Sequence, residues 1–323
     1  MKRIGLSALP VVGAGIVLSL VLPSILLAES SSFLDPGGEI AADQRTHLIR
    51  VTALTMVAII PVYLLLPIIL RKYRRGNKNA DYKPRWEFSL PLEIAMWGVP
   101  AILVAIMSFY LWHSTHDLDP YKPIESSNST VNVQVVGLDW KWLFIYPDLG
   151  IATVGEMGMP VDHPVAMDLT SDTVMQSFIV APLAGQINTM AGMTTKLHMM
   201  ADKPGTYEGE NVLYSGNGFV DQKFDAIAMA PDAFDTWVAK VKSEGILLDQ
   251  KAYDILAIQG STEQAHEALK ATMADKGTVY FNLPDAHLFH KIVMKYHDGK
   301  SLPLDQQPGT AEFNAAANQE ATQ

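Results

Sequence analysis

Residues 51–70 read VTALTMVAIIPVYLLLPIIL, a run of 20 residues without a charged side chain. A helix needs about 20 apolar residues to cross the ~30 Å hydrocarbon core of a bilayer. A second run over 88–116 spans 29 residues and contains a single charged side chain, Glu93. The two runs therefore predict membrane-spanning helices at about 48–70 and 91–113, forming a helical hairpin within 29–117.

A third apolar run, residues 4–28, follows Met1-Lys2-Arg3 at the start of the chain. Its basic start and the small residue Ala28 at its end are typical of a secretory signal, whereas its length exceeds the usual apolar region of roughly 7 to 15 residues. We expect segment 1–28 to be either a signal peptide or an additional N-terminal membrane helix.

The segment that joins the two later runs predicts their orientation. It is strongly basic, and its charged residues are Arg71, Lys72, Arg74, Arg75, Lys78, Lys83 and Arg85 against Asp81 and Glu87. Short loops rich in Lys and Arg remain in the cytoplasm. We therefore expect a multi-pass protein of a bacterial inner membrane, with everything beyond about residue 114 in the periplasm.

The charge changes sign along the chain. Residues 1–113 carry 11 Lys and Arg against 7 Asp and Glu, whereas residues 114–323 carry 13 against 27, and no Arg follows Arg85. An acidic distal half does not suit a nucleic-acid binder, which needs clustered basic residues. The sequence contains no Cys, which excludes disulfides, thiolate metal sites, iron–sulfur clusters and a cysteine nucleophile.

Beyond a hinge at 120–130, the distal half has the pattern of a β-sandwich followed by helices. Short apolar runs broken by Gly, Pro, Asn and Asp predict strands, at 131–136, 142–146, 165–169, 178–180, 196–199, 212–214 and 224–229. Helical periodicity follows at 233–242, 250–258 and 263–274. We expect a β domain over 118–230, a C-terminal helical segment over 231–300, and a disordered tail over 301–323.

Several motifs, in order along the chain, resemble one family. They are Leu34-Asp35-Pro36, Glu93 with Trp97 and Pro100, Asp139-Trp140-Lys141-Trp142, Ile145-Tyr146-Pro147, Thr170-Ser171-Asp172-Thr173-Val174-Met175, Met190-Ala191-Gly192-Met193, Pro204-Gly205-Thr206-Tyr207 and Tyr214-Ser215-Gly216. The chain resembles subunit II of heme-copper terminal oxidases, particularly ubiquinol oxidases of the cytochrome bo type. The resemblance implies a membrane-anchored, mainly β protein, in which a transmembrane helical hairpin carries a cupredoxin-like β-sandwich with C-terminal helices.

One departure from the related cytochrome c oxidases concerns copper. Their subunit II holds a binuclear copper site on one His and a Cys-x-Glu-x-Cys-x3-His-x2-Met loop. Aligned without gaps, these positions hold Gln176, Asn211, Leu213, Ser215, Phe219 and Gln222 in this chain. Amides and hydroxyls do not replace thiolates as ligands of Cu(I). We therefore expect no metal here. A second departure is that quinol-oxidising relatives start with a lipoprotein signal ending in a lipid-modified Cys, which this sequence does not contain.

The resemblance implies a non-catalytic subunit II of a proton-pumping quinol oxidase. Ubiquinol would be oxidised and oxygen reduced in a complex whose subunit I holds the hemes and copper, with smaller membrane subunits as further partners. This chain would bind no cofactor and would not interact with cytochrome c. The alternative is a membrane-tethered, cupredoxin-like periplasmic binding module without an enzyme partner.

Glu93 is the candidate for proton uptake. A carboxylate within an apolar run is costly, by ~2.5 to 3.5 kcal/mol at a helix centre, so such residues usually face protein or water and mark a pathway. The resemblance implies an entrance carboxylate of a proton channel on this helix. The alternative is a carboxylate that reaches the membrane interface, stabilised by the positive end of the helix dipole.

The remaining candidates have weaker patterns. The pairs His113/His116 and His287/His290 have helical spacing, but no third metal ligand is evident near either pair, so we expect interfacial or packing roles. The aromatic residues of 140–146 predict packing, because no copper is present to receive an electron through them. Ser215 lacks the flanking glycine pattern of a hydrolase nucleophile.

Overall fold

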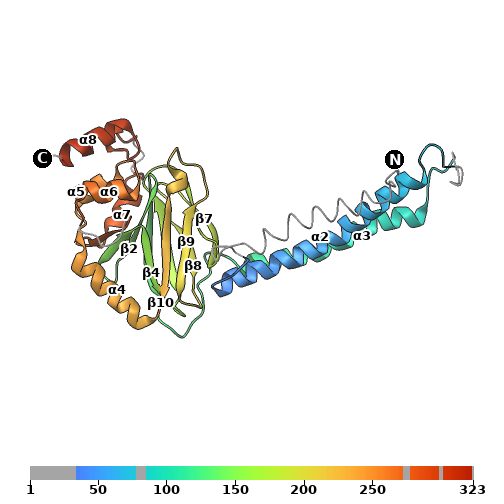
Figure 1. Cartoon of the computed structure of the whole chain (residues 1–323), viewed down its shortest axis with the longest axis horizontal. Coiled ribbons are helices and arrows are strands. Elements are labelled where there is room, and N and C mark those ends of the chain that lie inside the picture. The colour runs from blue at the N-terminus through green and yellow to red at the C-terminus, as the bar shows by residue number, and fades with distance from the viewer. Residues whose placement is uncertain (1–33, 78–84, 272–276, 298–300, 322–323) are drawn as a thin grey trace, which may run out of the picture. The chain divides into compact units, whose positions relative to one another are not determined.

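The computed structural model describes residues 34–77, 85–271, 277–297 and 301–321. The expected signal or membrane segment over 1–28 lies outside these residues. The chain divides into two compact units, one comprising Ala42–Lys122 and the other comprising the described residues before and after it (Figure 1).

The first unit consists of two long apolar helices. Helix α2 (Glu39–Lys72) has 34 residues and α3 (Leu90–Asp117) has 28, so that at 1.5 Å per residue both exceed the ~30 Å thickness of a bilayer core. Among the described residues, α3 contains no buried side chain, and its Trp97 is 74% exposed. So continuous an apolar surface fits a lipid environment, and both helices are long and apolar enough to cross a membrane.

The helix ends follow from local chemistry. Helix α2 ends in Arg71 and Lys72, which interact favourably with the negative end of the helix dipole. Helix α3 begins with a proline in its first turn and has Glu93 in the same turn. Proline is tolerated there because its missing N–H would lack a helical partner in any case.

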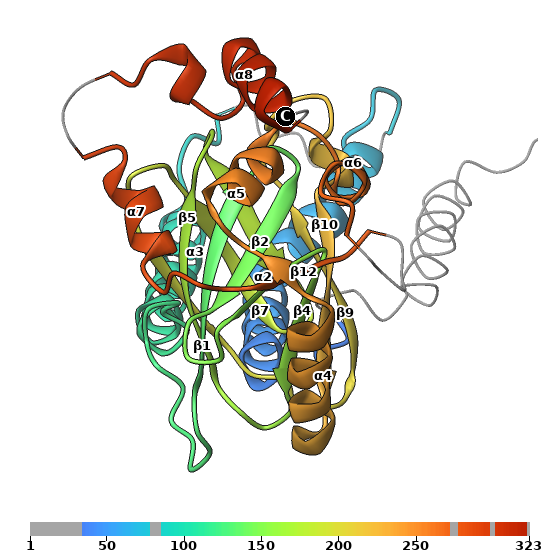
Figure 2. The ribbon, with the colours of Figure 1, turned by 90° about the vertical axis from the view of Figure 1, so that its left-hand side faces the viewer.

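The second unit is a sandwich of a seven-stranded and a five-stranded sheet (Figure 2). The first sheet has the order β11-β12-β3-β2-β1-β5-β8, and the second has the order β4-β10-β9-β6-β7. The strands of the first are β11 (Ile246–Leu247), β12 (Val279–Asn282), β3 (Ile151–Val154), β2 (Lys141–Tyr146), β1 (Val131–Leu138), β5 (Val165–Ser171) and β8 (Thr195–Met199). Those of the second are β4 (Glu156–Pro160), β10 (Lys223–Met229), β9 (Gly205–Asn211), β6 (Gln176–Val180) and β7 (Ala184–Thr189).

Strand β2 connects two hydrophobic cores because alternate side chains of a strand point to opposite faces. Trp142, Phe144 and Tyr146 lie in the core between the sheets. Leu143 and Ile145 lie in a second core, which the C-terminal helices cover. All six residues of the strand are buried, as expected for a strand with packing on both faces.

In the described part of the chain after β10, five α-helices alternate with the short strands β11 and β12. They are α4 (Pro231–Glu244), α5 (Gln250–Ala257), α6 (Thr262–Ala268), α7 (Leu288–Met294) and α8 (Ala311–Ala321). Helix α4 buries Phe234, Trp237, Val238 and Val241 on one face. The Asp249 side chain caps α5, and Ser261 with Gln264 forms a capping box at α6, which supplies partners for the free N–H groups of the first turn.

The expected disordered tail over 301–323 differs from the structure. A short 3-10 helix, η2 (Leu304–Gln306), precedes α8. Phe313 and Ala317 of α8 are 7% and 4% exposed and belong to the second core. The segment is polar on average, but these two side chains are one helical turn apart and share a face, which is enough to dock the helix.

Candidate functional site

Three buried amide side chains gather at one end of the five-stranded sheet. Gln176 begins β6, Asn211 ends β9, and Gln222 immediately precedes β10. The exposed fractions of these residues are 0%, 4% and 0%. Strands β6, β9 and β10 are neighbours in the sheet, so the sheet order itself brings the three positions together. We call these residues, with Ser215, the amide cluster.

The amide cluster is linked by direct hydrogen bonds. Gln222 Nε2 donates to Gln176 Oε1 at 2.7 Å. Asn211 Nδ2 donates to Gln222 Oε1 at 3.0 Å and to Ser215 Oγ at 3.0 Å. The side chains therefore bond to one another at the positions where the sequence comparison predicted the remains of a copper site.

The other polar atoms of the cluster bond to the backbone. Gln176 Nε2 donates to the Leu138 carbonyl at 2.9 Å. Asn211 Oδ1 accepts from the N–H groups of Ser177 at 2.9 Å and Leu213 at 3.0 Å. Each amide oxygen and nitrogen of Gln176, Asn211 and Gln222 thus has a partner, as buried polar groups require. Because Leu138 ends β1, the cluster also ties the two sheets together.

Two of the six predicted positions do not join the cluster through their side chains. Leu213 contributes only its backbone N–H, to Asn211. Phe219 begins the 3-10 helix η1 (Phe219–Asp221), and its ring packs edge-on against Tyr214 at 5.2 Å between centroids. The structure therefore brings together four of the six positions, Gln176, Asn211, Ser215 and Gln222.

Trp140 covers the loop that carries Ser215. Its indole Nε1 donates to the Ser215 carbonyl at 3.2 Å, and its backbone has a positive φ of 67°. A side chain at Gly218 would lie 2.3 Å from the ring, and Gly216 has a φ of +115°. The glycines of the Tyr-Ser-Gly-Asn-Gly segment therefore allow close contact with the indole and do not form a nucleophile turn.

Sequence reasoning missed the buried Lys141 next to the cluster. Its Nζ donates to the carbonyls of Ile258 and Gly260, both at 2.8 Å, and to that of Asp139 at 3.1 Å. Burial lowers the pKa of Lys141 to about 8, partly offset by the nearby charge of Asp139. A lysine inside the apolar strand sequence Trp-Lys-Trp-Leu-Phe was the signal that could have identified it.

A second missed group centres on Asp172, which is 1% exposed. Its carboxylate accepts from the hydroxyls of Tyr253 and Tyr296, both at 2.7 Å, and pairs with Lys295 Nζ at 3.1 Å. Burial, together with the Asp172 charge, raises the pKa values of both tyrosines well above their usual range. These bonds connect α5 and the residues that follow α7 to the loop between β5 and β6, which precedes Gln176.

Glu93 lies in the first turn of α3 and is half-buried. Its Oε2 accepts a hydrogen bond from Trp97 Nε1, one turn later, at 3.2 Å. The carboxylate thus has a fixed partner on its own helix and one oxygen available for water or another side chain.

The histidine pairs show local contacts. His113 packs against Phe109 at 4.4 Å between ring centroids, and His116 Nδ1 lies 2.7 Å from the Trp112 carbonyl. His287 precedes the first turn of α7, which contains His290. Over the described parts of the chain, no group of three or more His, Asp or Glu side chains is arranged to hold a metal ion.

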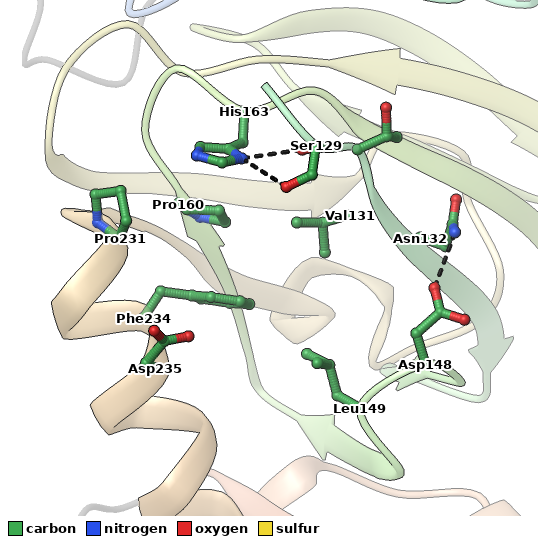
Figure 3. Close-up of a pocket in the computed structure, with 11 residues that line it drawn as sticks. Ser129, Val131, Asn132, Asp148, Leu149, Pro160, His163, Pro231, Phe234 and Asp235 are labelled. Atoms are coloured by element: carbon green, nitrogen blue, oxygen red, sulfur yellow. Dashed lines mark hydrogen bonds between the residues drawn. The ribbon is translucent and has the colours of Figure 1, made fainter. Parts of the chain in front are cut away.

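A surface cavity of about 330 Å³ lies where β1 begins and α4 starts (Figure 3). His163 Nδ1 lies 2.9 Å from the Ser129 carbonyl, and Asn132 Nδ2 donates to Asp148 Oδ2 at 2.9 Å. These polar groups bond within the cavity wall, so they form no reactive cluster.

Comparison with known proteins gives a consistent group of relatives. No family model matches the chain. It is 40% identical over 298 residues to the cytochrome bo(3) ubiquinol oxidase subunit 2 of Pseudomonas aeruginosa, covering 91% of this chain and 86% of that protein. It is 38% identical over 278 residues to the ubiquinol oxidase subunit 2 of Acetobacter aceti, covering 85% of each. It is 33% identical over 238 residues to the quinol oxidase subunit 2 of Bacillus subtilis, covering 73% and 74%.

A solved structure is also similar to part of the chain. The periplasmic domain of subunit II of cytochrome oxidase from Bradyrhizobium japonicum aligns over 38% of this chain and 98% of that domain, with 18% identity and a TM-score of 0.36.

Proposed function

Because this chain belongs to the subunit 2 family of ubiquinol oxidases, we propose that it is the redox-inactive subunit 2 of a proton-pumping ubiquinol oxidase of the aerobic respiratory chain. In this complex ubiquinol is oxidised and oxygen is reduced to water in subunit I, which holds the hemes and copper. The present chain supports subunit I and smaller membrane subunits, carries no redox centre and accepts no electrons from cytochrome c.

The closed amide cluster carries the proposal that the chain has no copper site. A binuclear copper centre needs soft sulfur ligands and imidazoles with free lone pairs. Gln176, Asn211 and Gln222 offer amides whose oxygen and nitrogen atoms already bond one another or the backbone. Binding a metal here would require breaking these buried bonds, and leaving a buried polar group unpaired costs about 1 to 3 kcal/mol.

The cluster instead has a structural role. Gln176 and Gln222 both donate to the Leu138 carbonyl at the end of β1, which joins the five-stranded sheet to the seven-stranded one. Hydrogen bonds between amides therefore hold the loops that metal ligands would otherwise hold. Electrons bypass this subunit and pass from ubiquinol to the centres of subunit I.

Membrane orientation follows from the basic residues between α2 and α3. Arg71, Lys72, Arg74 and Arg75 follow directly on the apolar part of α2, and loops of this composition stay in the cytoplasm. The protein is thus a multi-pass protein of the inner membrane, with the sandwich and C-terminal helices in the periplasm.

Glu93 then lies near the cytoplasmic surface and contributes to proton uptake. The hydrogen bond from Trp97 fixes the direction of one carboxylate oxygen, and the other oxygen can exchange protons with water that enters a channel at subunit I. A half-buried carboxylate in an apolar helix is typical of such pathways.

Purification of the full-length chain from its native membrane tests the proposal. An affinity tag at the C-terminus should recover heme-containing protein with ubiquinol oxidase activity. A tagged, unrelated inner-membrane protein from the same cells serves as the control. A chain that is folded and membrane-inserted but free of heme would contradict the oxidase role and favour a free-standing periplasmic binding module.

A further inference from the structure

A polar cavity lies between the ends of α2 and α3 that are farthest from the basic loop. It has a volume of about 190 Å³, and its wall combines acidic, basic and aromatic side chains. The lining residues include Asp43, His47 and Arg50 of α2 and Tyr110, His113 and Asp117 of α3. All of them belong to the helical unit.

Arg50 marks the boundary of the hydrocarbon region, because the uncharged run over 51–70 begins at the next residue. Its guanidinium makes no hydrogen bond or ion pair with the rest of the described chain. An unpaired guanidinium at this depth faces the layer in which the phosphates of phospholipids lie. Arginine suits such a partner, because its planar fork can donate two hydrogen bonds to one phosphate.

Asp43 supplies the opposite charge farther from the hydrocarbon. It lies seven residues before Arg50, so it is on the same face of α2 and about 10 Å farther along the helix axis. At that separation the two charges do not pair, and the Asp43 carboxylate likewise makes no ion pair among the described residues.

The second helix repeats the same order. Tyr110 lies toward the hydrocarbon side, His113 follows one turn later, and Asp117 ends the helix. The only ion pair of Asp117 within the described chain is a long contact of 3.8 Å with Lys122, and both side chains are largely exposed. The wall is therefore cationic and hydrogen-bonding near the hydrocarbon and acidic away from it.

A phosphoethanolamine headgroup has the complementary order of charge. Its phosphate adjoins the glycerol, next to the acyl chains, and its ammonium group extends away from the membrane. We propose that this cavity binds the headgroup of one phosphatidylethanolamine molecule, with the phosphate at Arg50 and the ammonium group at Asp43 and Asp117. The order of charges is defined relative to the apolar runs and holds for either orientation of the protein in the membrane.

Competitive lipid exchange tests the site on the full-length chain with its co-purifying subunits. The delipidated protein is mixed with equal amounts of phosphatidylethanolamine, phosphatidylcholine and phosphatidylglycerol, and the retained lipids are counted by native mass spectrometry. We expect phosphatidylethanolamine to be retained about tenfold over each of the others, as one or two charge-assisted hydrogen bonds would give. The trimethylammonium group of phosphatidylcholine cannot donate to Asp43, and phosphatidylglycerol has no cation. Equal retention of the three lipids would overturn the proposal.

Variants separate the two halves of the site. Arg50→Gln should lower retained phosphatidylethanolamine about tenfold, whereas Arg71→Gln at the other end of α2 should have no effect. Asp43→Asn combined with Asp117→Asn should abolish the preference over phosphatidylglycerol and leave phosphate-dependent retention intact. This double variant gives an independent result if the Arg50→Gln protein fails to insert into the membrane.

Two further measurements distinguish a bound lipid from free phosphate or a protein partner in the cavity. Added inorganic phosphate should leave the bound lipid in place, and displacement of the lipid by phosphate would contradict a headgroup site. Loss of other subunits in Arg50→Gln with lipid retention unchanged would identify a protein contact instead and would overturn the proposal.

Discussion

The Lys141 ammonium group is buried where the sandwich meets the end of α5, and the reason lies in the backbone. The carbonyls of Ile258 and Gly260 follow the last turn of α5 and have no helical N–H partner. Lys141 donates to both, so one side chain of β2 satisfies two groups at a helix end and links the sandwich to the C-terminal segment.

The lowered pKa of Lys141 should make the stability of the folded chain depend on pH. Its pKa is about 8 in the folded chain and 10.5 when exposed, so between these values the unfolded chain binds more protons than the folded one. The free energy of unfolding should therefore rise with pH, by about 1 to 2 kcal/mol between pH 8 and 9.5. Lys141→Met should remove this rise and should also lower the free energy of unfolding by an amount that does not vary with pH. Denaturant unfolding at a series of pH values measures both effects. The exposed control Lys251→Met should keep the rise, and a Lys141→Met profile parallel to the wild type would contradict the assignment.

Glu93 can be tested with a substitution that separates its two possible roles. Glu93→Gln retains an oxygen that can accept from Trp97 but cannot carry a proton. If the residue collects protons, Glu93→Gln and Glu93→Ala should both lower ubiquinol oxidase turnover several-fold at normal heme content, and Glu93→Asp should retain more activity.

The exposed Glu87, just before α3, provides the matched control. Glu87→Ala should leave turnover unchanged. Normal turnover in fully assembled Glu93→Gln and Glu93→Ala complexes would remove the proton-uptake role and leave Glu93 as an interfacial carboxylate.

At the scale of elements, the strongest periodic patterns predicted the structure best. The apolar run at 51–70 lies within α2, and the helical periodicity over 233–242 lies within α4, which buries Phe234, Trp237 and Val241 on one face. Strands β3, β4, β7, β9, β11 and β12 were missed because they are short or rich in glycine and polar residues. Their positions depend on pairing with distant strands, such as β4 with β10, which local patterns do not encode.

In the candidate site, too, some residues could be predicted from the sequence, whereas contacts between distant residues could not. The resemblance identified Gln176, Asn211, Ser215 and Gln222 because loop positions can be aligned without coordinates. The strand predicted at 212–214 is instead an irregular segment, because Asn211 bonds back to the Leu213 N–H and ends β9. The role of Asp172 could not be predicted, because its tyrosine and lysine partners lie more than 80 residues away in the sequence.

Helix α8 offers a test of docking by a single side chain. Phe313→Ala should cost up to about 3 to 5 kcal/mol of local stability, the usual cost of truncating a buried Phe. The amides of α8 should then exchange hydrogen faster by at least tenfold, measured by hydrogen–deuterium exchange with mass spectrometry. Glu312→Ala alters an exposed neighbour on the same helix and should leave the exchange unchanged. Unchanged exchange in Phe313→Ala would show that α8 is not held by this contact.

At the scale of the whole molecule, membrane topology determines which side of the membrane each proposed role serves. A reporter fused near Asn79 should behave as cytoplasmic, and one fused near Gln306 should behave as periplasmic, because the basic segment between α2 and α3 stays inside. Paired alkaline phosphatase and fluorescent protein fusions at both positions measure this. The reverse pattern would move Glu93 to the periplasmic side and remove its role in proton uptake.

At this scale our central proposal is that subunit I carries all the redox centres and that this chain carries none. Hydrogen bonds link the buried amides of Gln176, Asn211 and Gln222, and on this basis we propose that the chain offers no electron acceptor to a protein donor. In this proposal its contribution to the oxidase is support of subunit I and uptake of protons.

Oxygen uptake by the purified complex, with ubiquinol or reduced cytochrome c as the donor, tests this claim most directly. We expect rapid oxygen consumption with ubiquinol and none above background with cytochrome c, at any ionic strength that permits docking of the cytochrome. Oxygen consumption driven by cytochrome c, or a complex that is inactive with ubiquinol although its hemes are intact, would contradict the account.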